Sequence, residues 1–503
     1  MNLPANHPFE GVQNLPAFID ELARRDFAMF VRHAFPLVHG GAALDWNWHL
    51  DTMTYYLNEI DQGRNQRLVV NLPPRNLKSF MISVAWVAWM LGRDPRRNFV
   101  CISYSNELSA KLARDCLTIM QSALYRRLFP KTIISTKRSA NYDFNTTRGG
   151  GRLATSVTGT LTGRGGDFII IDDPIKPSDA YSETIRESVN DWYRTTLSSR
   201  LNDKRKGAII CVMQRLHQYD LCGLMLEDGG WQHLCLPAIA SEDGSFPMTR
   251  NRVHMRKADD VLHPSREPRW ALDKIKNEQG SHTFAAQYLQ APVPAKGNII
   301  FKEWLVHMKE EFPSHGEIVQ SWDTGVKDGE KNDYSACITA RLVGKHVYIL
   351  DVFRKRLAFP DLLRTATAHA LEYKAQTLLV EDAASGNQLI TMMREAKVSG
   401  VPLPLARKVE QDKTSRVHGM SPLIEQGRLV LPASAPWLAD FEAELTAFPS
   451  VRHDDQVDAL SQLINWMVIN RQQSTPTLAG PIHVEEGDSY RRYGDSSYLD
   501  PWV

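Results

Sequence analysis

The chain has 503 residues, of which 43% are hydrophobic and 23% are charged, and its formal net charge is +1. This length is too great for one hydrophobic core and predicts two domains, while the composition is that of a soluble globular protein. The near-neutral charge gives no sign of nucleic-acid binding over the whole chain, so any contact with DNA requires a local basic patch.

Six cysteines are scattered along the chain without a CxxC pair. This pattern argues against a disulfide framework or a zinc ribbon and favours reduced thiols in the cytosol. The first residues lack the basic start and the apolar run of a signal peptide. The longest apolar run, at about residues 80–91, is shorter than the roughly 20 residues that span a bilayer, so we expect no membrane segment.

Residues 1–66 are predicted to be a helical lead-in, since 45–60 carries apolar and aromatic residues at helical spacing. Short apolar segments then alternate with helical patterns, which predicts a parallel α/β sheet in a domain over 67–290. The glycine-rich stretch 149–166 is expected to be a mobile loop or hairpin. The expected strands are 67–72, 98–103, 167–171 and 208–213, and the expected helices are 79–91 and 106–128.

A proline-glycine joint, APVPAKGN, predicts a linker over 291–317. A second α/β pattern follows over 318–472, and residues 473–503 are polar and broken by proline and glycine, so we expect a disordered tail. The expected elements of the second domain are a strand ending at Asp323, a strand at 377–380, and helices at 359–375 and 454–469.

A nucleotide site is predicted where the strand at 67–72 runs into a loop and then an apolar helix, as in a P-loop. Lys78 would pair with the β- and γ-phosphates of ATP, and Ser79 would hold Mg²⁺. Neither glycine of the GxxxxGK[ST] pattern is present, because Leu72 and Leu77 stand in their places, so a plain lysine at a helix start is the alternative. The predicted ATP-binding residues of the loop are Arg75, Asn76, Leu77, Lys78 and Ser79.

A second element of the nucleotide site is the apolar segment 168–171, which ends in Asp172 and Asp173. A carboxylate at the carboxyl end of a buried strand beside a P-loop holds Mg²⁺, so we assign Asp172 this role. Asp173 stands where many such ATPases have the glutamate that orients the attacking water. Because aspartate is one methylene shorter, Glu183 and Glu187 remain alternatives for this catalytic role.

A third element is Gln214, which follows the strand at 208–213 and is predicted to sense the γ-phosphate. Arg215 either shares that role or only pairs with an acidic residue. Arg164 and Arg200 are candidates for an arginine finger, which would neutralise charge on the transferred phosphoryl group of a neighbouring subunit. A plain surface role is the alternative for both arginines.

A carboxylate site is predicted in the second domain, where Asp323, Glu381 and Asp455 are the expected catalytic residues. Two-metal nucleases hold Mg²⁺ or Mn²⁺ with such oxygen ligands, and an acid on each of two strands with a third on a helix is the ribonuclease-H-like arrangement. Capping of the last helix is the alternative role for its acids, and His453 either assists proton transfer or is structural. The acids stand in three groups: Asp323, then Glu381 and Asp382, then Asp454, Asp455 and Asp458, of which all but Asp382 are the predicted metal ligands.

A local basic patch lies between the second and third groups of acids and contains Lys408, Lys413 and Arg416. Such a patch is expected to grip DNA phosphates near the cut, and a solvated charged loop is the alternative.

Together these segments resemble the large terminase subunit of tailed bacteriophages, over roughly residues 45–470. The P-loop segment NLPPRNLKS resembles that family's divergent P-loop, in which an arginine precedes the lysine and the last glycine can be lost. The segments GTLTGRGGDFIIIDDP, VMQRLHQYDL, SWDTG with NDYSA, and HDDQVDAL are similar to family blocks in the same order.

This resemblance implies an N-terminal P-loop ATPase domain and a C-terminal ribonuclease-H-like nuclease domain. It implies a motor that hydrolyses ATP to drive double-stranded DNA into a procapsid and that cuts concatemeric DNA with a two-metal endonuclease, using Mg²⁺ or Mn²⁺. The implied partners are the portal protein, a small terminase subunit and further copies in a ring, expected to be a pentamer. The implied location is the host cytoplasm, transiently at the procapsid portal, and not the mature virion.

Two other interpretations stay open at this stage. The first is a transposase or integrase with a ribonuclease-H-like core and an ATPase module. The second is a non-catalytic scaffold on the portal, which the loss of the P-loop glycines favours. The aromatic residues of the tail, Tyr490, Tyr493, Tyr498 and Trp502, leave docking on the portal or procapsid as an alternative to plain disorder.

Overall fold

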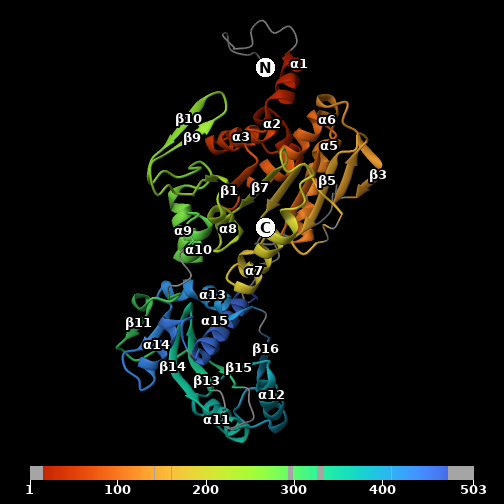
Figure 1. The fold of residues 1–503 in the computed structure, drawn as a ribbon. Coiled ribbons are helices and arrows are strands. Elements are labelled where there is room, and N and C mark those ends of the chain that lie inside the picture. Colours follow the sequence, from red (N-terminus) through yellow and green to blue (C-terminus); the bar gives the residue numbers. More distant parts are fainter. Residues whose placement is uncertain are drawn as a thin grey trace, which may run out of the picture.

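The computed structural model describes residues 15–473, except 141, 160, 162, 293–297, 326–333, 409–410 and 452. The predicted tail and its aromatic residues lie outside the described part. The described residues form two lobes, each built on its own sheet (Figure 1). The strand order is β3-β4-β5-β2-β6-β7-β1-β8 in the first lobe and β11-β17-β14-β13-β12-β15-β16 in the second. The predicted α/β class is confirmed for both lobes.

The elements of the first lobe are interleaved along the chain. Its helices are α1 (Leu15–Arg25), α2 (Phe27–Val38), α3 (Trp48–Asp61), the π-helical η1 (Phe80–Trp86), α4 (Val87–Arg93), α5 (Asn106–Gln121), α6 (Ala123–Leu128), η2 (Pro177–Asp179), α7 (Glu183–Trp192), η3 (Tyr193–Leu197), α8 (Leu221–Asp228), α9 (Arg269–Gln279) and α10 (Ser281–Gln287). Its strands are β1 (Arg67–Asn71), β2 (Asn98–Ser103), β3 (Ile134–Ala140), β4 (Asp143–Thr146), β5 (Gly151–Ser156), β6 (Phe168–Asp172), β7 (Ala208–Met213), β8 (Gln232–Cys235), β9 (Gly244–Met248) and β10 (Arg252–Arg256).

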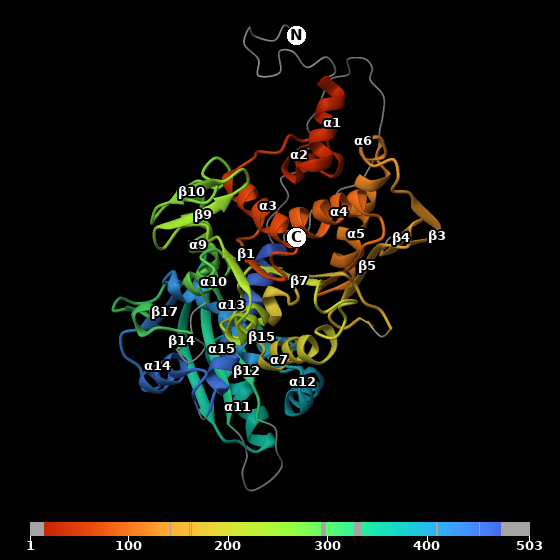
Figure 2. The same cartoon turned by 45° about the horizontal axis from the view of Figure 1, so that its top comes forward.

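The first sheet is buried on both faces, which explains why its strands are continuous apolar runs. Along β1, Leu68 and Val70 pack in the core under the N-terminal helices, whereas Val69 packs in the core on the opposite face. Strands β1, β2, β6 and β7 pair in parallel, as predicted from their alternation with helices. The hairpin of β9 and β10 lies beside α3 (Figure 2), where Trp48 packs on Phe246.

The longest apolar run of the sequence, residues 80–91, is a core helix and every one of its residues is buried. In the part of the chain that the structure describes, no helix is both long enough and apolar enough to cross a bilayer.

One local prediction in the first lobe was wrong, and a second needs more detail. The helix expected over 106–128 is broken at Ser122, which has extended backbone angles and accepts a hydrogen bond from the Tyr125 amide at 3.1 Å, so that it caps α6. The glycine-rich stretch 149–166 was expected to be a mobile loop or hairpin, and its first part belongs to a hairpin, because β5 pairs antiparallel with β4. Strand β5 also lies inside the sheet, between β4 and β2. A Cβ on Gly150 would come within 2.4 Å of backbone at Arg96 and Arg97, so close packing requires this glycine.

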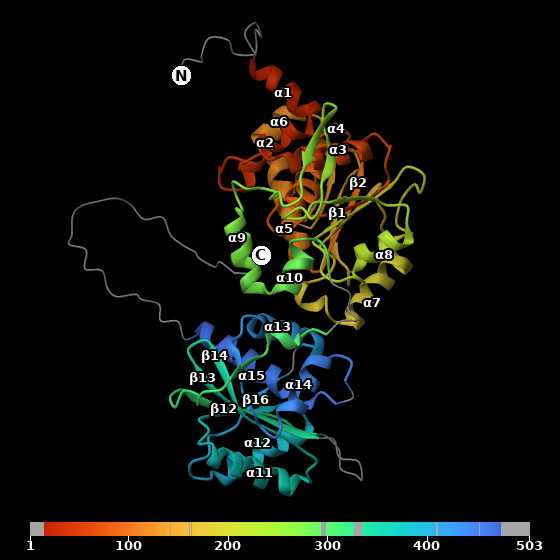
Figure 3. The same ribbon diagram turned by 90° about the vertical axis from the view of Figure 1, so that its left-hand side faces the viewer.

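The second lobe has strands β11 (Val306–Met308), β12 (Glu317–Asp323), β13 (Ser335–Val343), β14 (His346–Lys355), β15 (Thr377–Glu381), β16 (Leu405–Arg407) and β17 (Leu429–Pro432). Its helices are η4 (Lys302–Trp304), α11 (Phe359–Glu372), α12 (Ala384–Ala396), α13 (Lys413–Glu425), α14 (Leu438–Ala447) and α15 (Asp455–Gln473). Strand β11, which lies within the stretch predicted to be a linker, pairs in parallel with β17. Helix α13 lies on the side of this lobe that faces α10 of the first lobe (Figures 1 and 3).

Candidate ATPase and nuclease sites

The P-loop and the two acids of the first lobe meet at one edge of its sheet. Strand β7 lies between β1 and β6, and its register pairs Asn71 with Met213 and Val212 with Asp172. The carboxyl ends of these three parallel strands therefore lie side by side, and each is followed by a predicted site residue. This is the edge at which open α/β sheets bind ligands.

Asp172 is held by the first turns of the helix that follows the P-loop. The Ser79 hydroxyl donates to Asp172 Oδ1 at 2.8 Å, and the Ser83 hydroxyl donates to Asp172 Oδ2. Burial, together with the charge of Asp173, raises the pKa of Asp172 to about 7. A buried acid beside a serine hydroxyl is an oxygen donor set that fits Mg²⁺, because a bound cation would stabilise the ionised carboxylate.

Lys78 lies in the same site, since its ammonium is 3.4 Å from Asp173 Oδ2 and its side chain is buried. Gln214 is also buried, and its Oε1 has no hydrogen-bond partner. Unpaired buried polar atoms are uncommon. The Lys78 ammonium is therefore placed to contact a bound phosphate, whereas the Gln214 oxygen is an acceptor open to a donor such as water; the roles of both residues remain predictions.

The loop adopts a glycine-like backbone without glycine. Arg75 and Leu77 both have φ of 62°, in the left-handed region. Leu77 occupies the position of the second P-loop glycine, so the backbone keeps the conformation while the residue type has changed. Non-glycine residues in this region cost about 1–2 kcal/mol. The sequence pattern therefore underestimates the likeness of this loop to a P-loop.

Replacement of Leu77 by glycine is expected to leave the protein about 1 kcal/mol more stable than replacement by alanine, since only alanine retains the strain of a Cβ at positive φ. Both variants lose the same packing of the leucine side chain on the core. Urea unfolding of the pair measures the difference directly, and an alanine variant as stable as the glycine variant would contradict the backbone argument.

The other predicted residues of the first lobe have different surroundings. Arg215 donates from Nε to both carboxylate oxygens of the buried Asp220, at 3.0 and 3.1 Å, so its role as an acid partner is supported by the structure. Asp220 in turn caps α8 by accepting from the Gly223 amide at 2.8 Å. Glu183 lines a cavity between the lobes, and the exposed Glu187 lies on the same helix.

Arg164 and Arg200 lie beside the amino end of β6, the opposite end from Asp172. The Arg200 carbonyl accepts from the Gly166 amide at 3.1 Å, just before β6 begins. The Arg164 side chain pairs with Asp143 at 3.1 Å. Within one chain these arginines are therefore not beside the P-loop, and an arginine-finger role is compatible only with action on a neighbouring copy.

The acids of the second lobe also meet at one sheet edge. Strands β12 and β15 are parallel, with Trp322 opposite Val380, so that Asp323 and Glu381 follow at the same end. Helix α15 packs across this sheet, where the Gln462 amide donates to the Ser321 hydroxyl at 3.0 Å. The first turn of α15 therefore lies over the ends of both strands.

Asp323 is at the centre of this cluster. Burial raises its pKa well above the ordinary value, and the charges of Asp458, Glu381 and Asp455 raise it further. Asp455 Oδ2 is buried and has no hydrogen-bond partner. Carboxylates buried together repel one another unless a cation or proton lies between them. The donor set therefore fits hard divalent cations such as Mg²⁺ and Mn²⁺.

The carboxylates of the second lobe do not all point at one common position for a metal ion. Among the described residues, no three His, Cys, Asp or Glu side chains are arranged closely enough to hold a metal ion. Two of the acids are instead paired with cations: Lys413 Nζ lies 2.7 Å from Asp458 Oδ2 and 2.8 Å from Asp454 Oδ1, and the Arg416 guanidinium lies 2.7 Å from Asp458 Oδ1. Metal binding at Asp458 requires these cations to move.

These contacts change the interpretation of the predicted basic patch. Lys413, which is half exposed, and Arg416, which is buried, are both paired with acids of the same lobe, whereas Lys408 is exposed. A grip on DNA by Lys413 or Arg416 would first require release from Asp458. His453 packs edge-on against Tyr334 at 5.2 Å, and Asp382 donates its amide to the Arg407 carbonyl at 2.8 Å.

The residues that position the helix acids were not predicted from the sequence. The buried Glu444 accepts hydrogen bonds from the amides of Gln456 at 2.8 Å and Val457 at 3.2 Å, and so caps the start of α15. Arg354 pairs with the other oxygen of Glu444 at 2.6 Å. A glutamate inside a helical pattern carries no signal of this role, because its partners come from other elements.

Comparison with known proteins defines the class of the second lobe. Residues 320–466 match a family model described as the terminase RNaseH-like domain. The match contains all the acids predicted to bind metal in this lobe. This part of the chain is therefore a terminase RNase H-like domain. No curated protein sequence matches the chain.

Over most of its length the chain also has a fold similar to that of solved large terminases. The large terminase of one thermophilic bacteriophage, in its second crystal form, matches with a TM-score of 0.51 at 11% identity, covering 83% of this chain and 98% of that chain. The large terminase of bacteriophage HK97 matches at 11% identity over 84% and 95% of the chains, with a TM-score of 0.33. The magnesium-bound large terminase nuclease of thermophilic phage G20c matches at 15% identity over 34% and 97%, with a TM-score of 0.26. The predicted resemblance to large terminase subunits is confirmed.

Proposed function

We propose that this chain is the subunit of a viral DNA-packaging motor that hydrolyses ATP to translocate double-stranded DNA and cuts the DNA with a two-metal nuclease. One observation carries the proposal: a single chain contains both a P-loop-like site and a terminase RNase H-like domain. In the first, the Ser79 hydroxyl donates a hydrogen bond to Asp172; in the second, the acids gather at one sheet edge.

In the ATPase site, the loop amides and Lys78 bind the β- and γ-phosphates, and Ser79 and Asp172 hold Mg²⁺. Asp173 orients the attacking water, and its separation of 3.4 Å from Lys78 supports a position near the γ-phosphate. Gln214 senses the γ-phosphate from between the P-loop and the acids. The proposed arginine finger, Arg164 or Arg200, acts on the next copy in the ring.

In the nuclease site, Asp323, Glu381 and Asp455 would hold two Mg²⁺ or Mn²⁺ ions together with Asp454 and Asp458. When bound, such ions activate the attacking water and stabilise the leaving oxygen of a cleaved phosphodiester. The protein supplies the rest: Gln462 fixes α15 to β12, and Glu444 holds the first turn of that helix over the strand ends.

The remaining parts of the proposal concern organisation and partners. We assign residues 1–66 to a helical lead-in, 67–290 to the ATPase domain, 291–317 to a linker, 318–472 to the nuclease domain and 473–503 to a tail. The proposed partners are double-stranded DNA, a portal protein, a small terminase subunit and further copies of the chain in a pentameric ring. The proposed place of action is the host cytoplasm, at the procapsid portal, and not the mature virion.

A direct experiment incubates the purified full chain with plasmid and linear DNA, with Mn²⁺ or Mg²⁺, and with or without ATP. We expect phosphate release from ATP and metal-dependent breaks in the DNA. Strand-transfer products would instead favour the transposase or integrase alternative. Absence of ATP turnover, even with portal protein and DNA added, together with absence of cleavage, would favour the scaffold alternative.

A further inference from the structure

Helix α13 touches both lobes through opposite faces. Positions two apart on a helix lie about 200° apart around its axis. Lys413 and Arg416 lie on the face directed at the nuclease acids, whereas Ser415 and His418, each two positions further on, lie on the face directed at the ATPase lobe. Within one turn, α13 therefore contacts both the predicted metal ligand Asp458 and the ATPase lobe.

The contact on the ATPase side is made by the segment that follows the acids of the nucleotide site. The Ser415 hydroxyl donates to the Ser178 carbonyl at 3.2 Å, and the His418 ring stacks on Tyr181 with the ring centroids 3.7 Å apart. Both partners belong to residues 174–182, directly after Asp173. At the far end of α13, Glu425 accepts from the Ser281 amide at 2.8 Å.

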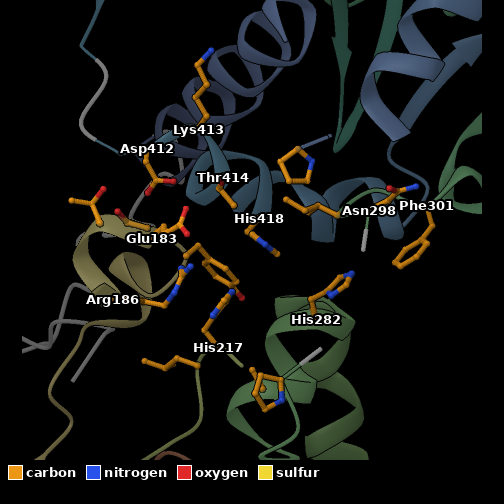
Figure 4. A pocket seen from close by; sticks show the side chains of 18 residues that line it. Glu183, Arg186, His217, His282, Asn298, Phe301, Asp412, Lys413, Thr414 and His418 are labelled. Carbon is orange, nitrogen blue, oxygen red and sulfur yellow. The ribbon is translucent and has the colours of Figure 1, made fainter. Parts of the chain in front are cut away.

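The contact leaves room for movement. A cavity of about 490 Å³ lies between the lobes beside these contacts (Figure 4). Tyr181, Arg186 of α7, His217 and His282 line it on the side of the ATPase lobe, and the start of α13 lines it on the other side. Lys413 and Asp412 stand at the edge of this cavity. A packed interior resists displacement, whereas an interface with such a space permits a shift of α13 without the loss of a core.

The charges at the other face show what such a shift would change. Asp458 has both carboxylate oxygens engaged by cations of α13, and Asp454 has one. A divalent cation needs these oxygens free of other partners. Lys413 is about half exposed, so its ammonium has space to leave, whereas Arg416 is buried with 9% of its side chain exposed.

We propose that α13 couples the two sites. Lys413 acts as a counter-ion of Asp454 and Asp458, and a metal ion must displace it to bind these acids. The contacts of α13 with segment 174–182 hold Lys413 in this position. The inference rests on the proposed nuclease function and adds a regulated state to it. Movement of segment 174–182 during the ATPase cycle would loosen α13, free the carboxylates and allow metal to bind. While α13 remains in contact with segment 174–182, Lys413 competes with the metal ion and weakens metal binding at the nuclease site.

The test is calorimetric titration of Mn²⁺ into the nucleotide-free full chain, comparing the wild type with Lys413→Met. The methionine keeps the aliphatic stem and removes the charge. The part of the Mn²⁺ binding heat that is lost in the Asp323→Asn variant is assigned to the nuclease site. We expect Lys413→Met to bind Mn²⁺ about tenfold more tightly at that site. Lys345→Met, which removes an exposed lysine from the turn between β13 and β14, is the matched control and should match the wild type.

A second measurement tests the link to the ATPase lobe. Hydrogen exchange of residues 413–425 in the full chain should become faster when a non-hydrolysable ATP analogue is added. Unchanged exchange would overturn the coupling. Equal or weaker Mn²⁺ binding by Lys413→Met, with the Asp323-dependent heat present, would overturn the counter-ion role and leave the proposed nuclease function standing. No Asp323-dependent binding in any variant would overturn both.

Discussion

Replacement of Lys78 by alanine is expected to abolish ATP hydrolysis and to leave metal-dependent DNA cleavage, measured without ATP, at the wild-type rate. The ammonium of Lys78 is the buried cation beside Asp173, at 3.4 Å, and in the proposed complex it neutralises charge on the transferred phosphoryl group. Loss of one such preorganised charge lowers kcat by about 100- to 1000-fold. Phosphate release and plasmid nicking, measured on the same preparation, give both readouts.

Lys111→Ala is the matched control, because Lys111 is half exposed on α5 and its partner, Asp115, lies one helical turn away at 3.6 Å. This control should hydrolyse ATP like the wild type. Hydrolysis by Lys78→Ala within about twofold of wild type would contradict the P-loop assignment. Equal loss of hydrolysis and of cleavage measured without ATP, in a folded Lys78→Ala protein, would contradict the separation of the two sites.

Replacement of Asp323 by asparagine is expected to have the reverse effect, with cleavage reduced at least about 100-fold and ATP hydrolysis retained. The same change should stabilise the metal-free protein. Asp323 lies partly buried beside three other acids whose charges oppose its ionisation, and a neutral amide removes that repulsion. We expect Tm in the presence of a chelator to rise by about 2–4 °C, which corresponds to about 1 kcal/mol for a domain of 150–250 residues.

The control for the second effect is Asp440→Asn, which removes an exposed charge from α14. Its Tm should equal that of the wild type. A Tm for Asp323→Asn that is equal to or below the wild-type value would show that the acids do not strain the metal-free site. Retention of full cleavage would remove Asp323 from the nuclease site altogether.

Local pattern predicted the scaffold of both sites well. Strands β1 and β6 are apolar runs that end in a polar residue, and β7 is an apolar run followed by Gln214; parallel pairing brings the ends of such strands to one edge. Asp323 and Glu381 were each predicted on a strand, and the parallel pairing of β12 with β15 brings them to one edge of the second sheet, while α15 begins at Asp455. Each of these predictions depended only on an apolar run and the polar residues within a few positions of its end.

Features that depend on distant partners were not predictable in this way. Leu77 looked incompatible with a P-loop, because a residue type does not reveal that its backbone takes positive φ. Lys413 looked like a DNA contact, because its pairing with Asp454 and Asp458 joins positions about forty residues apart in the sequence. The fixed distances of a helix make short-range pairs predictable, whereas these pairs follow from how α13 and α15 pack.

Diffraction from crystals of the full chain grown with Mn²⁺ and a non-hydrolysable ATP analogue tests the central claim most directly. The account predicts anomalous signal at two separate places: one beside Ser79 and Asp172 with the nucleotide phosphates, and one among Asp323, Glu381 and Asp455, with Lys413 displaced from Asp458. Manganese confined to the nucleotide, with the acids of the second lobe still bound only to Lys413 and Arg416, would contradict it.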